Sequence, residues 1–295
     1  MIETTETSVA RPRFELNMLL PYVFLHLVCL GVFWTGVSWK LIGVCLVSFY
    51  VRKFGIGAGF HRYFAHRSFK TSRAGQLVLA LLGTLTVQKG VLWWAETHRR
   101  HHRHADTPED IHSPTFQGFI YSHSGWFLDE RYQQTTYSKV ADLAKYPELR
   151  LLNDWRCDLA INLLYAFALY MLFGWGGVVW GFAISTVMLW HGTHLVQSVA
   201  HSYGGYRRCP TPDKSRNHWL MGLFFLGEYH NNHHYYPSSC RQGFAWWEID
   251  IEFYILKMLS WVGLVWDLRL PPESVRRGEF GAALTAEVNA ERASL

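Results

Sequence analysis

The charged residues are distributed so that they leave two long apolar segments in the chain. Residues 159–199 contain no Asp, Glu, Lys or Arg over 41 positions. One continuous helix of that length would extend ~60 Å, about twice the ~30 Å hydrocarbon core of a bilayer. The turn-forming sequence Gly174-Trp-Gly-Gly177 lies inside this segment. We therefore expect a hairpin of two membrane-spanning helices that turns at these glycines.

Residues 16–51 repeat this arrangement near the start of the chain. Their 36 positions contain one charged residue, Lys40, beside the small and polar sequence Thr35-Gly-Val-Ser38. This pattern predicts a second helical hairpin. The alternative is a pair of buried hairpins in a soluble protein. The lengths argue against it, as do 14 Trp and 15 Tyr residues, which suit the aromatic belts of a membrane protein.

The predicted fold is an all-α membrane protein with four transmembrane helices in two hairpins and a helical cytoplasmic cap. The hairpins are expected at about 16–51 and 159–199, and the cap at 52–158 and 200–270. Residues 1–15 form an N-terminal cytoplasmic segment, and residues 271–295 form a C-terminal tail. Because the leader carries acidic residues, the first span is interpreted as a signal anchor and not as a cleavable signal peptide.

Charge asymmetry predicts the orientation of this fold. Between Arg52 and Arg103 there are ten Lys or Arg residues and one acidic residue, Glu96, whereas the two hairpin turns carry only Lys40. An excess of Lys and Arg marks the cytoplasmic side.

Residues 74–87 are apolar but short for a span, so we expect them to form a helix in the membrane interface. The five cysteines are scattered, contain no C-x-x-C pair and are expected to be reduced.

Histidine is concentrated in three short motifs. They are His61-Arg-Tyr-Phe-Ala-His66, His98-Arg-Arg-His101-His102 and His230-Asn-Asn-His233-His234. Positions i, i+3 and i+4 share one helical face, so each of the last two motifs can supply ligands to two adjacent ions. His61 and His66 would lie about 140° apart around a regular helix, which predicts that the helix ends or loosens between them. Because neutral imidazole is the commonest transition-metal ligand, these eight histidines predict a two-metal site.

Other histidines lie along the same predicted helices. His201 follows the last predicted span, and Gln197 lies one turn earlier on the same side. His191 and His194 share this face but lie ~15 Å and ~10 Å deeper, so we expect them to line a tunnel or bond a neighbouring helix. His26, in the first span, is also expected to bond a neighbouring helix. Four more are expected behind the ligands or on the surface: His104, His112, His123 and His218.

The order H-x4-H, H-x2-H-H and H-N-x-H-H resembles that of the membrane-bound fatty acid desaturases, in particular the acyl-CoA desaturases of the stearoyl-CoA, delta-9 type. Further stretches are similar to this family, especially to its bacterial members. They are Gly57-Ala-Gly-Phe-His61-Arg, Asp110-Ile-His-Ser113, Gly118-Phe, Ser122-His123-x-Gly125-Trp126 and Gln242-Gly-Phe-Ala-Trp-Trp-Glu-Ile-Asp250. The similarity covers roughly residues 18–270, so residues 16–270 are interpreted as one desaturase domain.

The resemblance implies a ligand set for two iron ions. It consists of His61, His66, His98, His101, His102, His201, His230, His233 and His234. The family pattern usually has Asn at the position of Gln197, where the amide holds a water on one iron, and the longer side chain of Gln moves that amide. The lead Glu228-Tyr229-His230 is one residue shorter than usual, so a local backbone adjustment is expected.

The implied reaction is the insertion of a cis double bond into a long saturated acyl chain with O2 as co-substrate. A cofactor is needed because no side-chain acid or base removes hydrogen from an unactivated methylene. The expected substrate is acyl-CoA, and an acyl chain of a membrane lipid is the alternative. Carboxylates near the motifs are candidates to orient ligand imidazoles, or else pair with arginines: Glu96, Asp106, Asp110 and Glu228. Candidate walls of an acyl tunnel, or else core and interfacial residues, are Trp93, Trp94, Trp126, Trp190 and Thr193.

Electrons are expected from a separate protein of cytochrome b5 or ferredoxin type. The sequence shows no haem module and no cysteine set for an iron–sulfur cluster, and Gly55-Ile-Gly-Ala-Gly59 follows no predicted strand. The Arg-rich face suits coenzyme A phosphates, anionic lipid or an acidic redox protein. No nucleic-acid partner is expected. The alternatives are a fatty acid or alkane hydroxylase with similar motifs, and a non-catalytic metal-binding membrane protein.

Overall fold

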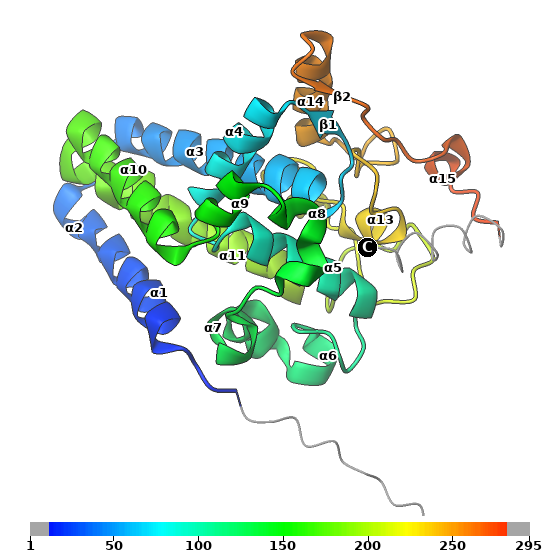
Figure 1. Cartoon of the computed structure of the whole chain (residues 1–295), viewed down its shortest axis with the longest axis horizontal. Helices are drawn as coiled ribbons and strands as arrows, with labels where there is room; N and C mark the ends of the chain where they lie inside the picture. The colour runs from blue at the N-terminus through cyan, green and yellow to red at the C-terminus, as the bar shows by residue number, and fades with distance from the viewer. Residues whose placement is uncertain (1–11, 282–295) are drawn as a thin grey trace, which may run out of the picture.

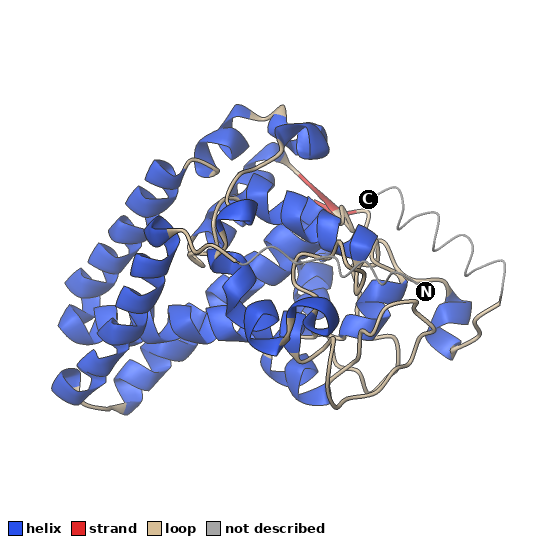
Figure 2. Ribbon diagram, turned by 90° about the horizontal axis from the view of Figure 1, so that it is seen from below, coloured by secondary structure: helices blue, strands red, loops and turns tan. Residues whose placement is uncertain are grey.

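The computed structural model describes residues 12–281 of the chain. Helices dominate these residues, and the short strands β1 (Lys70–Thr71) and β2 (Val265–Trp266) pair antiparallel. Long helices gather at one end of the molecule, and short helices and loops gather at the other (Figures 1 and 2). Most of the predicted N-terminal segment and residues 282–295 of the predicted tail lie outside the described residues.

Within residues 12–281, three helical segments are long and apolar enough to cross a membrane: Leu16–Thr35, Trp39–Ala65 and Trp155–Ser198. The first combines α1 (Leu16–Val28), a 3-10 turn (Cys29–Gly31) and α2 (Val32–Thr35). The second combines α3 (Trp39–Phe54) and the π-helical segment η2 (Gly55–Ala65). The third combines α10 (Trp155–Gly176), the π-helical segment η6 (Gly177–Ile184) and α11 (Ser185–Ser198).

Glycines break these helices where the sequence predicted the two turns. Gly36, between α2 and α3, has φ 67°, and the Ser38 hydroxyl caps α3. Gly174 has φ 61° and ψ −154°, so the 44-residue third segment consists of two helical legs. A positive φ is costly for residues with a Cβ, which explains glycine at both positions. The legs pack closely, since a Cβ on Gly177 would lie 2.2 Å from the Leu169 carbonyl oxygen.

The outer surfaces of the long helices are apolar. Phe33 at the end of the first segment is 86% exposed, and Trp39 at the start of the second is 88% exposed. Leu164 and Met171 on α10 are also exposed. A continuous apolar surface of this kind suits contact with lipid rather than with water.

The rest of the described chain is built from short helices. They are α4 (Arg73–Thr84), α5 (Val91–His104), α6 (Pro114–Gln117), η3 (Tyr121–Gly125), α7 (Trp126–Leu128), α8 (Ala141–Ala144), α9 (Pro147–Leu152), α12 (Trp219–Phe224), α13 (His230–Tyr235), α14 (Ile251–Trp261) and α15 (Glu273–Arg277). The helix predicted within residues 74–87 is confirmed as α4, whose 12 residues are too few to span a bilayer.

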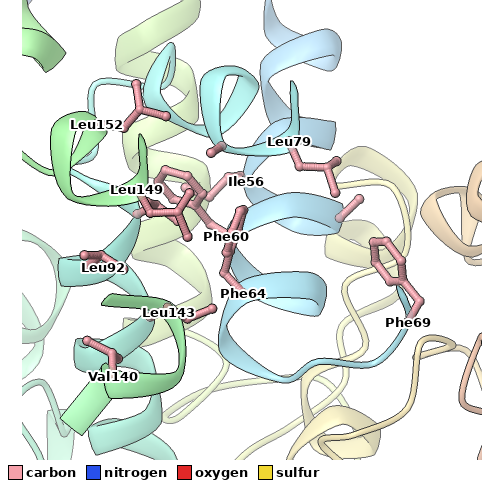
Figure 3. Packing of buried hydrophobic residues seen from close by; sticks show 14 of the residues in the cluster. Ile56, Phe60, Phe64, Phe69, Leu79, Leu92, Val140, Leu143, Leu149 and Leu152 are labelled. Atoms are coloured by element: carbon pink, nitrogen blue, oxygen red, sulfur yellow. The ribbon is translucent and has the colours of Figure 1, made fainter. Parts of the chain in front are cut away.

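The main apolar core supports one face of η2. Phe60 and Phe64 point into it and meet Leu79 of α4, Leu92 of α5 and Leu149 of α9 (Figure 3). The approach is close, because a Cβ on Gly83 of α4 would lie 2.1 Å from the Phe60 ring. Burial of the two aromatic rings fixes the rotation of η2 about its axis. The opposite face of η2, which carries His61, is thereby directed away from this core.

Candidate metal centre

The nine predicted histidines converge in two adjacent groups, in each of which one donor atom per residue lies within 4.8 Å of the others. The five-histidine group contains His61, His66, His98, His102 and His233. The four-histidine group contains His101, His201, His230 and His234. All except the partly buried His98 are buried. The motifs therefore meet in space, as their spacing predicted.

Each histidine trio is divided between the two groups. On α5, His98 and His102 stand one turn apart and face the five-histidine group, whereas His101 faces the other group. On α13, His233 faces the five-histidine group, whereas His230 and His234 face the other group. Two short helices thus hold both histidine groups side by side, because i, i+3 and i+4 positions share a face.

The π-helical geometry of η2 brings the first motif together. The amide of His66 donates to the carbonyl of His61 at 3.2 Å, an i→i+5 bond. A π-helix needs more residues per turn than an α-helix, so residues five apart return to the same side. The two ring centres are 5.0 Å apart. The helix loosens between these residues, which confirms the sequence prediction.

All nine rings turn their Nε2 atoms toward one another. The Nε2–Nε2 distance is 2.9 Å between His61 and His233, and 2.8 Å between His201 and His230. In total six such pairs, which together include all nine rings, span 2.8–3.3 Å. Two nitrogens that bind one ion at about 2.0–2.2 Å would lie at a comparable separation.

Buried carboxylates hold the outer nitrogen of every ring in the four-histidine group. The Nδ1 distances to the nearest carboxylate oxygen are 3.0 Å for His101–Asp110, 2.7 Å for His201–Asp106, 3.3 Å for His230–Glu228 and 3.1 Å for His234–Asp213. A carboxylate accepts, so Nδ1 carries the proton and Nε2 of a neutral ring carries a bare lone pair. Two bare lone pairs 2.8 Å apart, as in His201–His230, repel unless a cation lies between them. This donor set fits a metal ion.

The predicted carboxylates are placed unequally. Asp106, Asp110 and Glu228 contact ligand rings as expected, but Glu96 does not. Its carboxylate lies 3.7 Å from Lys139, so among the described residues its partner is a cation and not an imidazole. Asp213 was not predicted from the sequence, since it lies 21 residues before its partner His234 and in no histidine motif.

Burial favours the neutral form of several of these rings, whereas at His201 the bond to Asp106 outweighs burial and raises the pKa. Burial lowers the pKa of His98, His102, His233 and His234 well below the ordinary value, and the positive charge of neighbouring rings acts in the same direction. Burial also lowers the pKa of His230, to about 4 despite the nearby Glu228. Burial alone would raise the pKa of Glu228, but the bond from His230 and nearby positive groups lower it to about 2. Neutral rings with an ionised carboxylate are the forms that bind a metal ion.

A cavity adjoins the centre. Its lining includes Trp94, Thr193 and Gln197 beside His98 and His230. The predicted walls Trp94 and Thr193 are therefore placed at the cavity.

The other three predicted walls are placed in packed regions and are absent from this lining. Trp93 and Trp126 stack in an apolar cluster, 5.9 Å between ring centres, and Trp190 stacks on Tyr22. The indole N–H groups of Trp93 and Trp190 bond backbone carbonyls away from the lining, whereas that of Trp126 bonds the lining residue Gln197. Trp93 donates to the Tyr132 carbonyl and Trp190 to the Val87 carbonyl.

A separate chain of histidines connects α1, α11 and η3. His26 Nε2 lies 3.1 Å from His191 Nε2, and His191 Nδ1 lies 3.0 Å from His123 Nε2. This confirms that His26 bonds a neighbouring helix. His194 adjoins the chain, and its Nδ1 contacts the Ser124 hydroxyl.

The five cysteines are free: Cys29, Cys45, Cys157, Cys209 and Cys240. None lies in either histidine group. The donor set of the centre is therefore imidazole alone among the described residues. Imidazole ligands suit iron, zinc, copper and nickel, so the donor set alone does not choose the metal.

Comparison with known proteins identifies the family that has this arrangement. A family model described as fatty acid desaturase matches residues 14–259. The chain therefore belongs to the fatty acid desaturase family, and it is an oxidoreductase that desaturates fatty acyl chains.

Curated relatives carry the same activity in their names. A delta-9 acyl-lipid desaturase of Arabidopsis thaliana is 37% identical over 269 residues, which are 90% of this chain and 87% of that protein. An acyl-CoA 5-desaturase of Anemone leveillei is 37% identical over 258 residues, 86% of this chain and 79% of that protein. An sn-1 stearoyl-lipid 9-desaturase of Synechocystis is 36% identical over 259 residues, which are 86% of this chain and 80% of that protein. These names do not favour the hydroxylase alternative.

Proposed function

We propose that this enzyme inserts a cis double bond at the ninth carbon of a long saturated acyl chain, using O2 and two iron ions held by the nine histidines. The observation that carries the proposal is the pair of histidine groups whose Nε2 atoms face inward. When bound, the iron ions supply the oxidising power that side chains lack. Both delta-9 relatives and delta-5 relatives are similar to the chain. The delta-9 position is proposed because it also agrees with the motifs of the sequence.

The residues around the ions have separate tasks in this proposal. The carboxylates fix ring orientation through Nδ1, while the cavity beside Trp94 and Thr193 holds the acyl chain near the centre. The Gln197 side-chain oxygen accepts from the Trp126 indole at 2.9 Å. We propose that this bond positions the Gln197 amide, which in turn holds a water at one metal position.

The membrane arrangement that we propose has four crossings. Leu16–Thr35 and Trp39–Ala65 supply one crossing each, and the two legs of Trp155–Ser198 supply two. With four crossings the cap segments share one side of the membrane, and the ten Lys or Arg residues between Arg52 and Arg103 favour the cytoplasmic side. Cysteine labelling in intact and permeabilised cells tests this. A single cysteine at Glu109 should react only after permeabilisation.

The electron balance requires a partner. Reduction of O2 to two waters takes four electrons, of which the acyl chain supplies two, so an external donor supplies the other two. We propose a cytochrome b5-like or ferredoxin-like protein that docks on the basic cap. Reconstitution with each donor distinguishes the two, since only the true donor should restore turnover at low concentration.

Lipid analysis of an expressing host tests the activity. Gas chromatography with double-bond mapping should show new cis monoenes with the double bond at carbon nine. The relatives divide between acyl-lipid and acyl-CoA substrates, so purified enzyme is assayed with labelled stearoyl-CoA and with labelled phospholipid in parallel. Absence of any new monoene with wild-type protein present in the membrane, under conditions where a related desaturase is active, would contradict the proposal.

A further inference from the structure

The two histidine groups differ in what holds the outer nitrogen of each ring. In the four-histidine group every Nδ1 contacts a carboxylate: Asp110, Asp106, Glu228 or Asp213. In the five-histidine group no carboxylate bonds a ring among the described residues. The Nδ1 atoms of His66, His102 and His233 are buried without a hydrogen-bond partner, and the Nδ1 atom of His61 lies 3.4 Å from the Gln242 amide nitrogen.

We propose that this difference makes the two metal positions unequal, so that the four-histidine position binds its ion more tightly and releases it last. The inference rests on the proposed metal centre and extends it. A ring that donates Nδ1–H to a carboxylate is a more basic ligand and has a fixed orientation. Four such rings surround one position, and none surrounds the other.

The carboxylates themselves are held rigidly. Asp110 accepts from the backbone amides of Asp106 and His112, and Asp213 accepts from the amide of Ser215 and the hydroxyl of Thr211. Asp110 and Asp213 are 1% and 3% exposed. Because these acids are fixed before metal binds, the rings that they hold are also ordered, and little conformational freedom is lost on binding.

Charge strengthens the difference. Four buried carboxylates next to one group attract a divalent cation in a setting where water screens little. Near the five-histidine group, Arg99 donates to the Ala65 carbonyl next to His66, and its charge is paired with Asp142. The net field of contacting side chains therefore favours a cation at the four-histidine position.

Metal release from the purified iron-loaded enzyme tests the proposal. Increasing chelator is added, and the iron retained per chain is measured by mass spectrometry after desalting. The wild-type enzyme should lose its iron in two steps of one equivalent each. His66→Gln should abolish the first step and leave the second, which assigns the labile ion to the five-histidine group.

Variants of the carboxylates should act on the second step alone. Glu228→Gln is the cleanest, because among the described residues the Glu228 side chain makes its hydrogen bond to His230. We expect it to lower the chelator concentration for release of the retained ion by about 10- to 100-fold. Asp213→Asn should act in the same direction. The matched control is Glu96→Gln, whose buried carboxylate faces Lys139 instead of a ring and should leave both steps unchanged.

The outcomes separate this inference from the proposed function. Simultaneous loss of both equivalents from wild-type enzyme would overturn the inequality, as would an equal effect of Glu96→Gln or a shift of the first step by Glu228→Gln. Enzyme that desaturates without bound iron would instead overturn the proposed centre. The wild-type titration decides whether the two metal positions are unequal even where a variant does not fold.

Discussion

The metal centre and the chain formed by His26, His191 and His123 contain the same side chain at similar distances, yet they are built differently. In the centre, each ring turns Nε2 inward, and rings with nitrogens 2.8–3.3 Å apart have centres 4.3–5.1 Å apart, with the shortest separation in His61–His233. In the chain, His191 uses Nε2 for one neighbour and Nδ1 for the other, and nitrogens 3.0 Å apart accompany ring centres 5.2 Å apart.

This geometry separates ligation from hydrogen bonding. Where the two facing nitrogens lie to one side of the line that joins the ring centres, both can point at one ion. Where they lie on that line, one ring can donate a hydrogen bond to the other. His26 is consistent with the second case, since its Nδ1 lies 2.7 Å from the Tyr22 carbonyl and must donate there, leaving Nε2 as the acceptor. Proximity of histidines alone therefore does not define a metal site.

The largest expected effect follows from loss of a converging ring. His233→Ala should abolish desaturation and reduce bound iron, because this ring contacts both His61 and His102 through Nε2. Product in cell lipids and iron per purified chain are the measurements. His191→Ala is the matched control, and it should retain full iron. Wild-type product levels in the His233→Ala strain would refute the role of the centre.

A second effect concerns the support beneath the centre. A Cβ on Gly57 would lie 1.9 Å from the Glu252 carboxylate, which is buried and paired with Lys53 at 2.9 Å. Gly57→Ala should therefore destabilise the protein by about 1–3 kcal/mol and lower its melting temperature in detergent.

The comparison for Gly57 lies earlier in the same long helical segment. Gly43 has open space where its Cβ would lie. Gly43→Ala should raise the melting temperature, since alanine favours a helix over glycine by roughly 0.5–1 kcal/mol. Equal melting temperatures for the two variants would contradict the close packing of η2 on α14.

A smaller effect is expected at the cavity. Trp126→Phe removes the indole N–H that the Gln197 side chain accepts, so the turnover number should fall by roughly fivefold, the worth of one hydrogen bond, with iron content unchanged. Trp93→Phe also loses an indole bond, but to the Tyr132 carbonyl away from the cavity. It should lower stability and leave turnover intact. A larger loss of turnover in Trp93→Phe than in Trp126→Phe would contradict the role proposed for the Gln197 amide.

The smallest effect is expected in the histidine chain. His123→Gln retains a side chain able to bond His191. The free energy of unfolding should therefore fall by no more than about 1 kcal/mol, the contribution of one hydrogen bond. Iron content and product should match those of the wild type. Loss of one metal equivalent in this variant would show that the chain formed by His26, His191 and His123 binds an ion, as the metal centre is proposed to do.

The parts of this arrangement that follow from local spacing were predictable from sequence. The turns at Gly36 and Gly174, the helical trios and the loosened helix between His61 and His66 all depend on a few consecutive residues. The nine candidate ligands followed from clustering together with family resemblance. Both kinds of signal are readable without knowing how distant segments meet.

The features that sequence missed depend on tertiary contacts. The division of each trio between two groups depends on the docking of α5 against α13. Asp213 contacts His234 across 20 intervening residues that include α12, so no spacing marks it. Both Trp93 and Trp94 were predicted as candidate tunnel walls, but neighbours on a helix face different directions. Trp94 faces the cavity and Trp93 faces the apolar cluster.

Anomalous scattering at the iron edge, from crystals of the purified enzyme, tests the central claim most directly. Two peaks are predicted, one inside the group of His61, His66, His98, His102 and His233 and the other among His101, His201, His230 and His234. A single peak, or a peak between His123, His191 and His194, would contradict the account.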